Sequence, residues 1–200
     1  RLLVAPHSLR SRFLELVDRE IQHASLGREA RIVVKLNAIV DQPSIEALYR
    51  ASRAGVRVDV ISRGACSLLP GVKGVSERVT VRSVVGEFLE HSRIWSFANG
   101  GEPDWYIGSA DLMDRNLDRR VEAMVPVEDP EARARLTEII ETTLADDRRS
   151  WQLDPKGSWR RTEEITGVPG TCDVHQELKA RALAATIAAA APHRAHVGLG

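Results

Sequence analysis

The stretch RIVVKLNAIVDQPSIEALYRASRAGVRVDVIS, residues 31–62, decides the fold class. Residues 31–37 are an apolar, β-branched run that turns polar at its end, as a buried strand does. Residues 41–54 are predicted to form a helix with Asp41 as its cap, and residues 56–62 alternate as a second strand. A strand, a helix and a strand in this order predict an α/β fold.

The flanking sequence extends this pattern in both directions. Apolar residues at three- and four-residue steps predict a helix that begins after Ser8, its expected N-cap, and ends at Gly27. An amphipathic helix is predicted at residues 130–147, and further strands are predicted at residues 79–85, 94–98, 105–107 and 121–127. Because the middle of the chain is rich in strands, we expect a mixed sheet flanked by helices.

The sequence divides into a domain, residues 1–161, and a tail, residues 162–200. The tail begins with a linker rich in Gly, Pro and Thr and continues into an Ala-rich helix predicted at residues 176–191. Its histidines show no metal-ligand spacing with Cys172, so we assign them to the tail without a function: His175, His193 and His196.

Composition and charge exclude several classes of function. Lys plus Arg and Asp plus Glu both number 28, and a net charge near zero argues against binding nucleic acid through bulk charge. Cys66 and Cys172 lie far apart, which argues against a zinc site and favours a cytoplasmic location. No apolar run is long enough to span a bilayer, and peripheral attachment at the membrane is left open. Since the chain lacks an initiating Met, we expect a piece of a longer protein.

A histidine opens one of the predicted strands, in the sequence Glu90-His91-Ser92-Arg93. Residues two apart in a strand point to the same face, so His91 and Arg93 are predicted to project together. Arg63 follows an earlier strand and precedes a glycine. These groups could bind and protonate an anionic substrate.

Two further motifs follow along the chain. YIGSAD, residues 106–111, is a strand that ends in a small-residue turn, where Ser109 offers a hydroxyl and an N–H group to an anion. NLDRRVE, residues 116–122, puts two guanidinium groups and the carboxylate of Glu122 near the start of a strand.

This order of motifs resembles the half-motif of the phospholipase D superfamily, in which His-x-Lys is followed by Gly-Ser-x-Asn and then by Glu. In that superfamily the histidine is a nucleophile or an acid–base group, and the glutamate orients its ring. The resemblance implies that Glu122 fixes the tautomer of His91. The chain departs from the half-motif by having Arg93 for the Lys and Asp111 for the Asn.

Longer phrases resemble one branch of that superfamily, the type 1 polyphosphate kinases. The resemblance covers residues 1–161 and implies the C-terminal, phospholipase D-like catalytic domain of a four-domain enzyme. The phrases that carry it are RIVVKLNAIVD (31–41), SRGACSLLPGVKGVSE (62–77), FLEHSRI (88–94) and IGSADLMDRNLDRRVE (107–122).

Enzymes of that family move the terminal phosphoryl group between ATP and inorganic polyphosphate through a phosphohistidine, with Mg²⁺. The resemblance implies that Arg63 and His91 contact the nucleotide phosphates, with His91 acting as acid or base. It also implies that the phosphorylated histidine belongs to a preceding domain, so that this chain supplies half of a site and is inactive alone.

The remaining candidates for phosphate contact have structural alternatives. They are Lys35, Asn37, Ser109, Asp111, Arg119 and Arg120. The first two lie at the polar end of a buried strand, the next two could simply build a turn, and the two arginines could form an ion-pair cluster. Trp151 and Trp159 are predicted to pack the final helix down.

Three functions remain open. The chain could be a domain of an ATP–polyphosphate phosphotransferase, whose partners are ATP or ADP, polyphosphate and the preceding domains; a homo-oligomer is left open. It could instead be a binding module that holds nucleotide or polyphosphate without chemistry. A phospholipase D-type phosphodiesterase is the third interpretation, and Arg93 in place of Lys counts against it.

Overall fold

Nine strands form one mixed sheet in the computed structural model, which describes the backbone of residues 2–190. The strands are β1 (Leu3–Ala5), β2 (Arg31–Leu36), β3 (Arg57–Ser62), β4 (Val79–Val84), β5 (Arg93–Phe97), β6 (Asp104–Gly108), β7 (Glu122–Val127), β8 (Ser150–Leu153) and β9 (Trp159–Arg161). The helices are α1 (Leu9–Ser25), α2 (Gln42–Arg53), α3 (Pro130–Ala145), α4 (Thr162–Thr166) and α5 (Val174–Ala190), with short turns η1 (Asn99–Gly101) and η2 (Arg115–Arg119).

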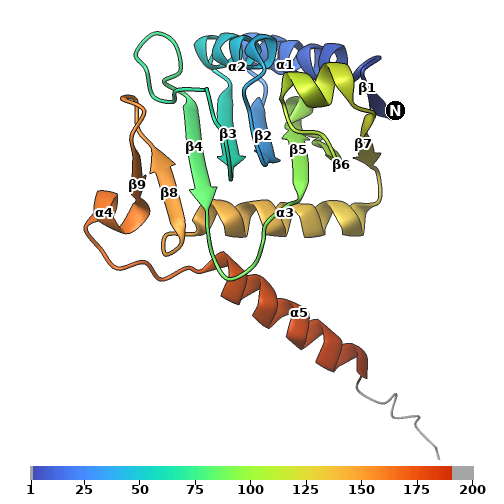
Figure 1. The fold of residues 1–200 in the computed structure, drawn as a ribbon. Helices are drawn as coiled ribbons and strands as arrows, with labels where there is room; N and C mark the ends of the chain where they lie inside the picture. The colour runs from blue at the N-terminus through green and yellow to red at the C-terminus, as the bar shows by residue number, and fades with distance from the viewer. Residues whose placement is uncertain (1, 191–200) are drawn as a thin grey trace, which may run out of the picture.

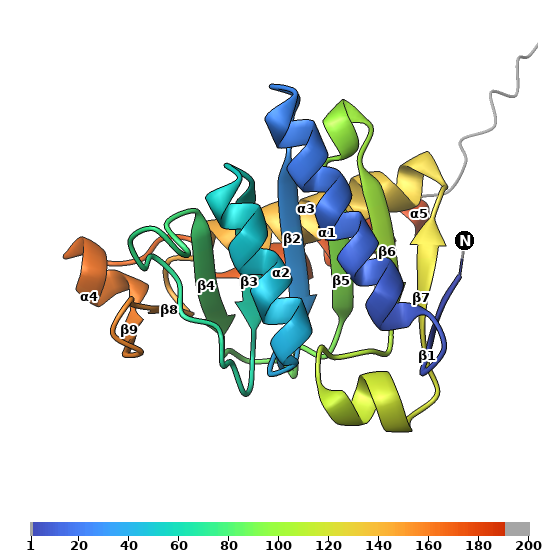
Figure 2. The same cartoon turned by 90° about the horizontal axis from the view of Figure 1, so that it is seen from above.

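The sheet has the order β1-β7-β6-β5-β2-β3-β4-β8-β9. Strands β2, β3 and β4 are parallel, and the other neighbours pair antiparallel. Helices α1 and α2 cover one face and α3 lies across the other (Figures 1 and 2). The predicted mixed sheet flanked by helices is therefore confirmed.

The parallel centre forms because β2 and β3 are apolar enough to be buried on both faces. Helix α2 begins as predicted, since the buried Asp41 carboxylate accepts hydrogen bonds from the N–H (3.1 Å) and the hydroxyl (2.6 Å) of Ser44. Ser8 is the N-cap residue of α1 as predicted, but its side chain does not cap the helix. Its hydroxyl lies against the backbone of Val4 and makes no capping hydrogen bond.

The main core lies between the sheet and helices α1 and α2. Phe13 of α1 is fully buried and packs edge to face on Trp95 and Phe97 of β5, with ring centroids 5.0 and 6.2 Å apart. Tyr106 of β6 continues this aromatic cluster from Phe97. The cluster fixes β5 in the middle of the sheet, and β5 is the strand that His91 leads into.

Residues 150–161 differ from the prediction, because they add β8 and β9 to the edge of the sheet beyond β4. These strands have four and three residues, too few for an alternating pattern to be detected. The prediction that the two tryptophans pack the final helix is wrong. Trp151 is 36% exposed on β8, and Trp159 of β9 packs against the main core.

The predicted Ala-rich helix is confirmed as α5, which extends away from the body of the molecule (Figure 1). His193 and His196 lie outside the described residues. Within residues 2–190, no helix is both long and apolar enough to cross a membrane.

Helix α3 provides a test of local helix capping. The Asp129 carboxylate accepts a 2.7 Å hydrogen bond from the N–H of Ala132, at an exposed N-terminus. We expect Asp129→Ala to lower the free energy of unfolding by about 1 kcal/mol, because that N–H loses its partner. Asp129→Ser, which keeps an acceptor, should restore most of the loss. Guanidinium unfolding followed by tryptophan fluorescence measures both, and equal stability of the two variants would contradict the capping role.

Candidate active site

Four residues from the predicted list meet at one edge of the sheet. Because β2 and β3 are parallel neighbours, the residues that follow them, Asn37 and Arg63, leave the sheet on the same side. Strand β5 runs antiparallel to β2 with Ile94 opposite Lys35, so His91 enters the sheet where β2 ends. We call this edge the site edge.

The next strand brings the second motif to the same place. Gly108, at the end of β6, lies opposite Arg93, at the start of β5. Ser109 and Asp111 therefore follow β6 at the site edge, and Glu122 begins β7 beside them. Gly108 is required here, since a Cβ on it would lie 2.0 Å from the carbonyl oxygen of Ala123.

Asn37 orients Arg63. Its amide Oδ1 accepts hydrogen bonds from Nε (3.1 Å) and Nη2 (2.8 Å) of the guanidinium. The remaining nitrogen, Nη1, is buried and has no hydrogen-bond partner within the described residues. Asn37 thus fixes the orientation of Arg63 and leaves Nη1 as the guanidinium nitrogen without a partner among the described residues.

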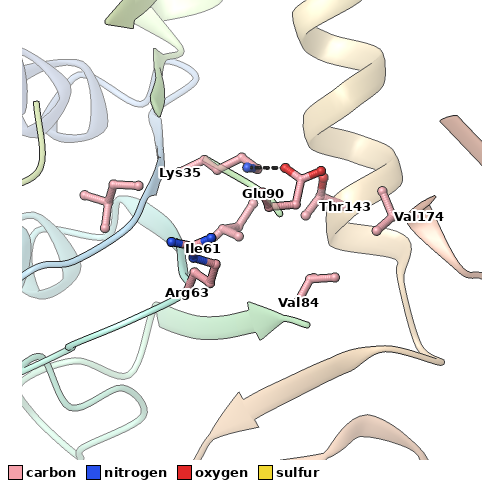
Figure 3. A pocket seen from close by; sticks show the side chains of 8 residues that line it. Lys35, Ile61, Arg63, Val84, Glu90, Thr143 and Val174 are labelled. Carbon is pink, nitrogen blue, oxygen red and sulfur yellow. Dashed lines mark hydrogen bonds and ion pairs between the residues drawn. The ribbon is translucent and has the colours of Figure 1, made fainter. Parts of the chain in front are cut away.

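Lys35 is buried at 4% exposure, and its charge is already paired. Its Nζ lies 2.7 Å from Oε2 of Glu90 (Figure 3). It also lies 2.7 Å from Oγ of Ser92, and both partners stand in the segment before β5. The adjoining cavity, lined also by Arg63 and Val174, has a volume of about 10 Å³, enough for about one water molecule. Lys35 therefore ties the end of β2 to the segment that carries His91.

The two departures from the phospholipase D half-motif bind one another. Nε and Nη2 of Arg93 donate to the two carboxylate oxygens of Asp111 at 3.2 and 3.1 Å, with the side chains 11% and 3% exposed. Asp111 also accepts from the backbone N–H groups of Asn37 (2.8 Å) and Ala38 (3.3 Å). This bidentate pair braces the site edge and leaves neither charge free.

Glu122 is buried and accepts a 2.7 Å hydrogen bond from Nδ2 of Asn116. No hydrogen bond or ion pair joins it to His91 within residues 2–190, so the orienting role stays a prediction. Ser109 is exposed, and its Oγ accepts from the N–H of Ala123 at 3.3 Å. That contact ties the turn after β6 to β7.

Arg119 and Arg120 are exposed at the end of η2. Neither forms an ion pair with Glu122, so the alternative of an ion-pair cluster between them is wrong for the described chain. The turn is held instead by Arg10 of α1, which donates to Asp118 at 2.5 and 2.6 Å. This contact holds the pKa of the Asp118 carboxyl below its usual range.

His91 is exposed, and its imidazole makes no hydrogen bond or ion pair to another described residue. Its backbone carbonyl accepts from Nη1 of Arg93 at 2.8 Å, which fixes the chain at the start of β5. The ring is thus free for a substrate, in contrast to the buried and paired groups around it.

A second hollow adjoins Arg63 on its other side. It has a volume of about 300 Å³ and is lined by Gly64, Val85 and the two tryptophans of β8 and β9. Its size and aromatic walls distinguish it from the small cavity beside Lys35.

Sequence reasoning missed several residues of this site. Glu90 and Ser92 stand beside His91 in the sequence without a predicted role, and Asn116 has none either. His175, assigned to the tail, is buried in α5 and lies 3.6 Å from Glu90. No local pattern identifies these residues, because each acts through a partner distant in sequence.

Comparison with known proteins bears on this arrangement. Residues 2–169 match the family described as "Polyphosphate kinase C-terminal domain 2". The chain belongs to this family. The polyphosphate kinase of Thermosynechococcus vestitus is 52% identical over 185 residues, which cover 92% of this chain and 25% of that protein.

Solved structures agree with the family assignment. The crystal structure of polyphosphate kinase from Porphyromonas gingivalis superposes with a TM-score of 0.82 at 36% identity, over 90% of this chain and 28% of the other. The phospholipase D family member Nuc from Salmonella typhimurium has a TM-score of 0.50 at 14% identity, over 69% and 88%. The latter likeness concerns the fold alone, and the fold is phospholipase D-like as expected.

The chain spans about a quarter of the length of these polyphosphate kinases. The matched residues 2–169 include the whole site edge and end before α5. The family match therefore includes His91 and Arg63, and the 92% of the chain that aligns with the T. vestitus enzyme includes His175 as well.

Proposed function

We propose that this chain is the C-terminal catalytic domain of an ATP–polyphosphate phosphotransferase. One observation carries the proposal: His91 and Arg63 both lie at the site edge. His91 is exposed and has no side-chain partner among the described residues, and Arg63 is oriented by Asn37. Family membership supports the assignment of these two groups to phosphoryl transfer.

The chemistry suits the residues. Phosphoryl transfer depends mostly on positioning and on stabilising charge on the equatorial oxygens. Nη1 of Arg63 can donate to such an oxygen, because its other two nitrogens are held by Asn37. His91 can protonate or hold the nucleotide oxygen from which the phosphoryl group departs. Exposed Arg119 and Arg120 remain candidates for contact with polyphosphate.

The same proposal makes this chain half of a site. The phosphohistidine is expected in a preceding domain, and the exposed ring of His91 is accessible to such a domain. Peripheral attachment at the membrane, a cytoplasmic location and a homo-oligomer stay predictions.

The residues of the site edge do not fit a resident Mg²⁺ ion. Glu90 is paired with Lys35, Asp111 with Arg93, and Glu122 with Asn116. Among residues 2–190, no cluster of three metal-binding side chains is present. We therefore propose that Mg²⁺ enters with the nucleotide, bound to its phosphates.

The structure weighs against a phosphodiesterase. In the phospholipase D half-motif the Lys and Asn would be free to hold a phosphate, whereas their replacements Arg93 and Asp111 bind each other and are buried. A binding module without chemistry would use Arg63 but would have no need of His91.

A grafted enzyme tests the proposal. The chain replaces the segment of T. vestitus polyphosphate kinase that aligns with it, and ATP formation is measured from polyphosphate, ADP and Mg²⁺. We expect the grafted enzyme to be active and the isolated chain to be inactive. An inactive grafted enzyme that still binds ADP would favour the binding module, and activity of the isolated chain would contradict the half-site.

A further inference from the structure

His91 lies on a connection that has no regular structure of its own. Residues 85–92 link β4 to β5, and we call them the His91 loop. The loop reaches the beginning of α5, although the two contacting residues, Phe88 and His175, are 87 positions apart in the sequence (Figure 1). Contacts with α5 therefore decide where the loop, and His91 with it, is held.

The central contact is made by His175, which is 3% exposed. Its Nδ1 accepts a 3.1 Å hydrogen bond from the backbone N–H of Phe88, and its ring centroid lies 5.5 Å from that of Phe88. An imidazole that accepts at Nδ1 carries its proton on Nε2. Nε2 lies 3.6 Å from Oε1 of Glu90, too far for a hydrogen bond, and has no other hydrogen-bond partner within the described residues.

Glu90 lies between His175 and the site edge. One of its carboxylate oxygens faces His175, and the other accepts from Nζ of Lys35 at 2.7 Å. Lys35 in turn donates to Ser92, the residue after His91. The loop is thus held on both sides of His91 by groups that converge on Glu90.

The backbone of the loop is shaped for this approach. A Cβ on Gly86 would lie 2.4 Å from Nδ1 of His175, closer than side-chain atoms come in proteins. Any larger residue at position 86 would push the loop and the imidazole apart. A second set of contacts comes from the first two turns of α5, where Gln176 (2.7 Å) and Lys179 (3.3 Å) donate to the carboxylate of Glu87.

The beginning of α5 is itself anchored to the body. The buried carboxylate of Asp146, at the end of α3, accepts from the N–H of Val174 at 2.8 Å. Asp173 caps the helix by accepting from the N–H of His175 and binds Arg149 at 2.8 Å. His175 therefore projects from a fixed point.

We propose that His175 is a positioning residue, which holds the His91 loop, through the hydrogen bond that it accepts from Phe88, in the conformation that phosphoryl transfer requires. The inference rests on the proposed function of His91. It assigns a role to the beginning of α5, which lies after the matched residues 2–169.

The test joins a structural and a kinetic measurement. Amide exchange of Phe88 is followed by NMR in the 200-residue chain, and kcat and the KM for ADP are measured in the grafted enzyme. The variants are His175→Ala, which removes the acceptor, and His175→Asn, whose Oδ1 can replace Nδ1. Gly86→Ala displaces the loop without removing a contact group, and Leu183→Ala, on an exposed part of α5, is the control.

We expect His175→Ala and Gly86→Ala to speed exchange of the Phe88 amide at least tenfold. Both should lower kcat roughly tenfold with a KM for ADP within about twofold, because misplacement of a reacting group costs rate more than binding. His175→Asn should recover most of the protection and of kcat, and Leu183→Ala should change neither.

Two results would overturn the inference. One is a Phe88 amide that exchanges at the same rate in the native chain and in His175→Ala. The other is faster exchange with an unchanged kcat, which would leave His175 a merely structural residue. An inactive grafted enzyme with native His175 would refute the proposed function and the kinetic part with it, whereas Phe88 exchange would still show whether His175 holds the loop.

Discussion

Replacing His91 with alanine in the grafted enzyme is expected to lower kcat for ATP formation roughly 10²–10⁴-fold, the usual contribution of a general acid or base. The imidazole is exposed and unpaired within the described residues, so its loss removes chemistry without removing a structural contact. The melting temperature of the 200-residue chain should therefore stay within about 1 °C of the native value.

His23→Ala is the matched control, since His23 lies on α1 against η1, at the opposite end of the sheet. It should leave kcat unchanged. Activity of His91→Ala within about threefold of the native grafted enzyme would show that His91 only lines the site. A large drop in the melting temperature of the 200-residue chain would show that the imidazole makes structural contacts within that chain, which would contradict its being unpaired.

Asp111→Ala is expected to cost the chain roughly 3–5 kcal/mol of unfolding free energy, as removal of one partner from a buried ion pair does. The Arg93 side chain, which is 11% exposed in the native structure, would lose its carboxylate partner. The N–H groups of Asn37 and Ala38 would lose their acceptor as well. Guanidinium unfolding followed by tryptophan fluorescence measures this loss.

Asp111→Asn keeps an oxygen for the backbone N–H groups and should cost less than Asp111→Ala. Asp114→Ala removes an exposed carboxylate three residues away and should have almost no effect. Adding Arg93→Met to Asp111→Ala should recover part of the stability, because no unpaired charge then stays buried. A loss below about 1 kcal/mol in Asp111→Ala would mean that water solvates Arg93 and that the pair does not brace the site edge.

The Arg93–Asp111 pair also explains why two polar replacements in the phospholipase D half-motif, Arg for Lys and Asp for Asn, change what these two positions can bind. A free Lys and a free Asn are contacts for a phosphate, whereas an Arg and an Asp at the same positions satisfy each other. The chain therefore keeps the histidine of the half-motif, but its residues at the Lys and Asn positions are not free to bind a phosphate. Under the proposed function, the phosphate contacts come instead from Arg63, whose Nη1 has no partner among the described residues.

The sequence by itself determined the sheet from β2 to β7 and helices α1, α2 and α3, and it identified His91 and Arg63 within phrases typical of one family. These features are local: a buried strand or an amphipathic helix is specified by the spacing of apolar side chains within a few residues. The short β8 and β9 were missed because three or four residues cannot establish a period, and they depend on pairing with β4.

Only the tertiary structure decided which charges are free. Lys35 meets Glu90 across 55 residues, Arg93 meets Asp111 across 18, and His175 meets Phe88 across 87. The strength of an ion pair or a hydrogen bond depends on the distance and burial of its two atoms, and strand register and helix packing fix both. A sequence shows which residues could bind a phosphate, but whether they are already bound to one another is a property of the folded chain.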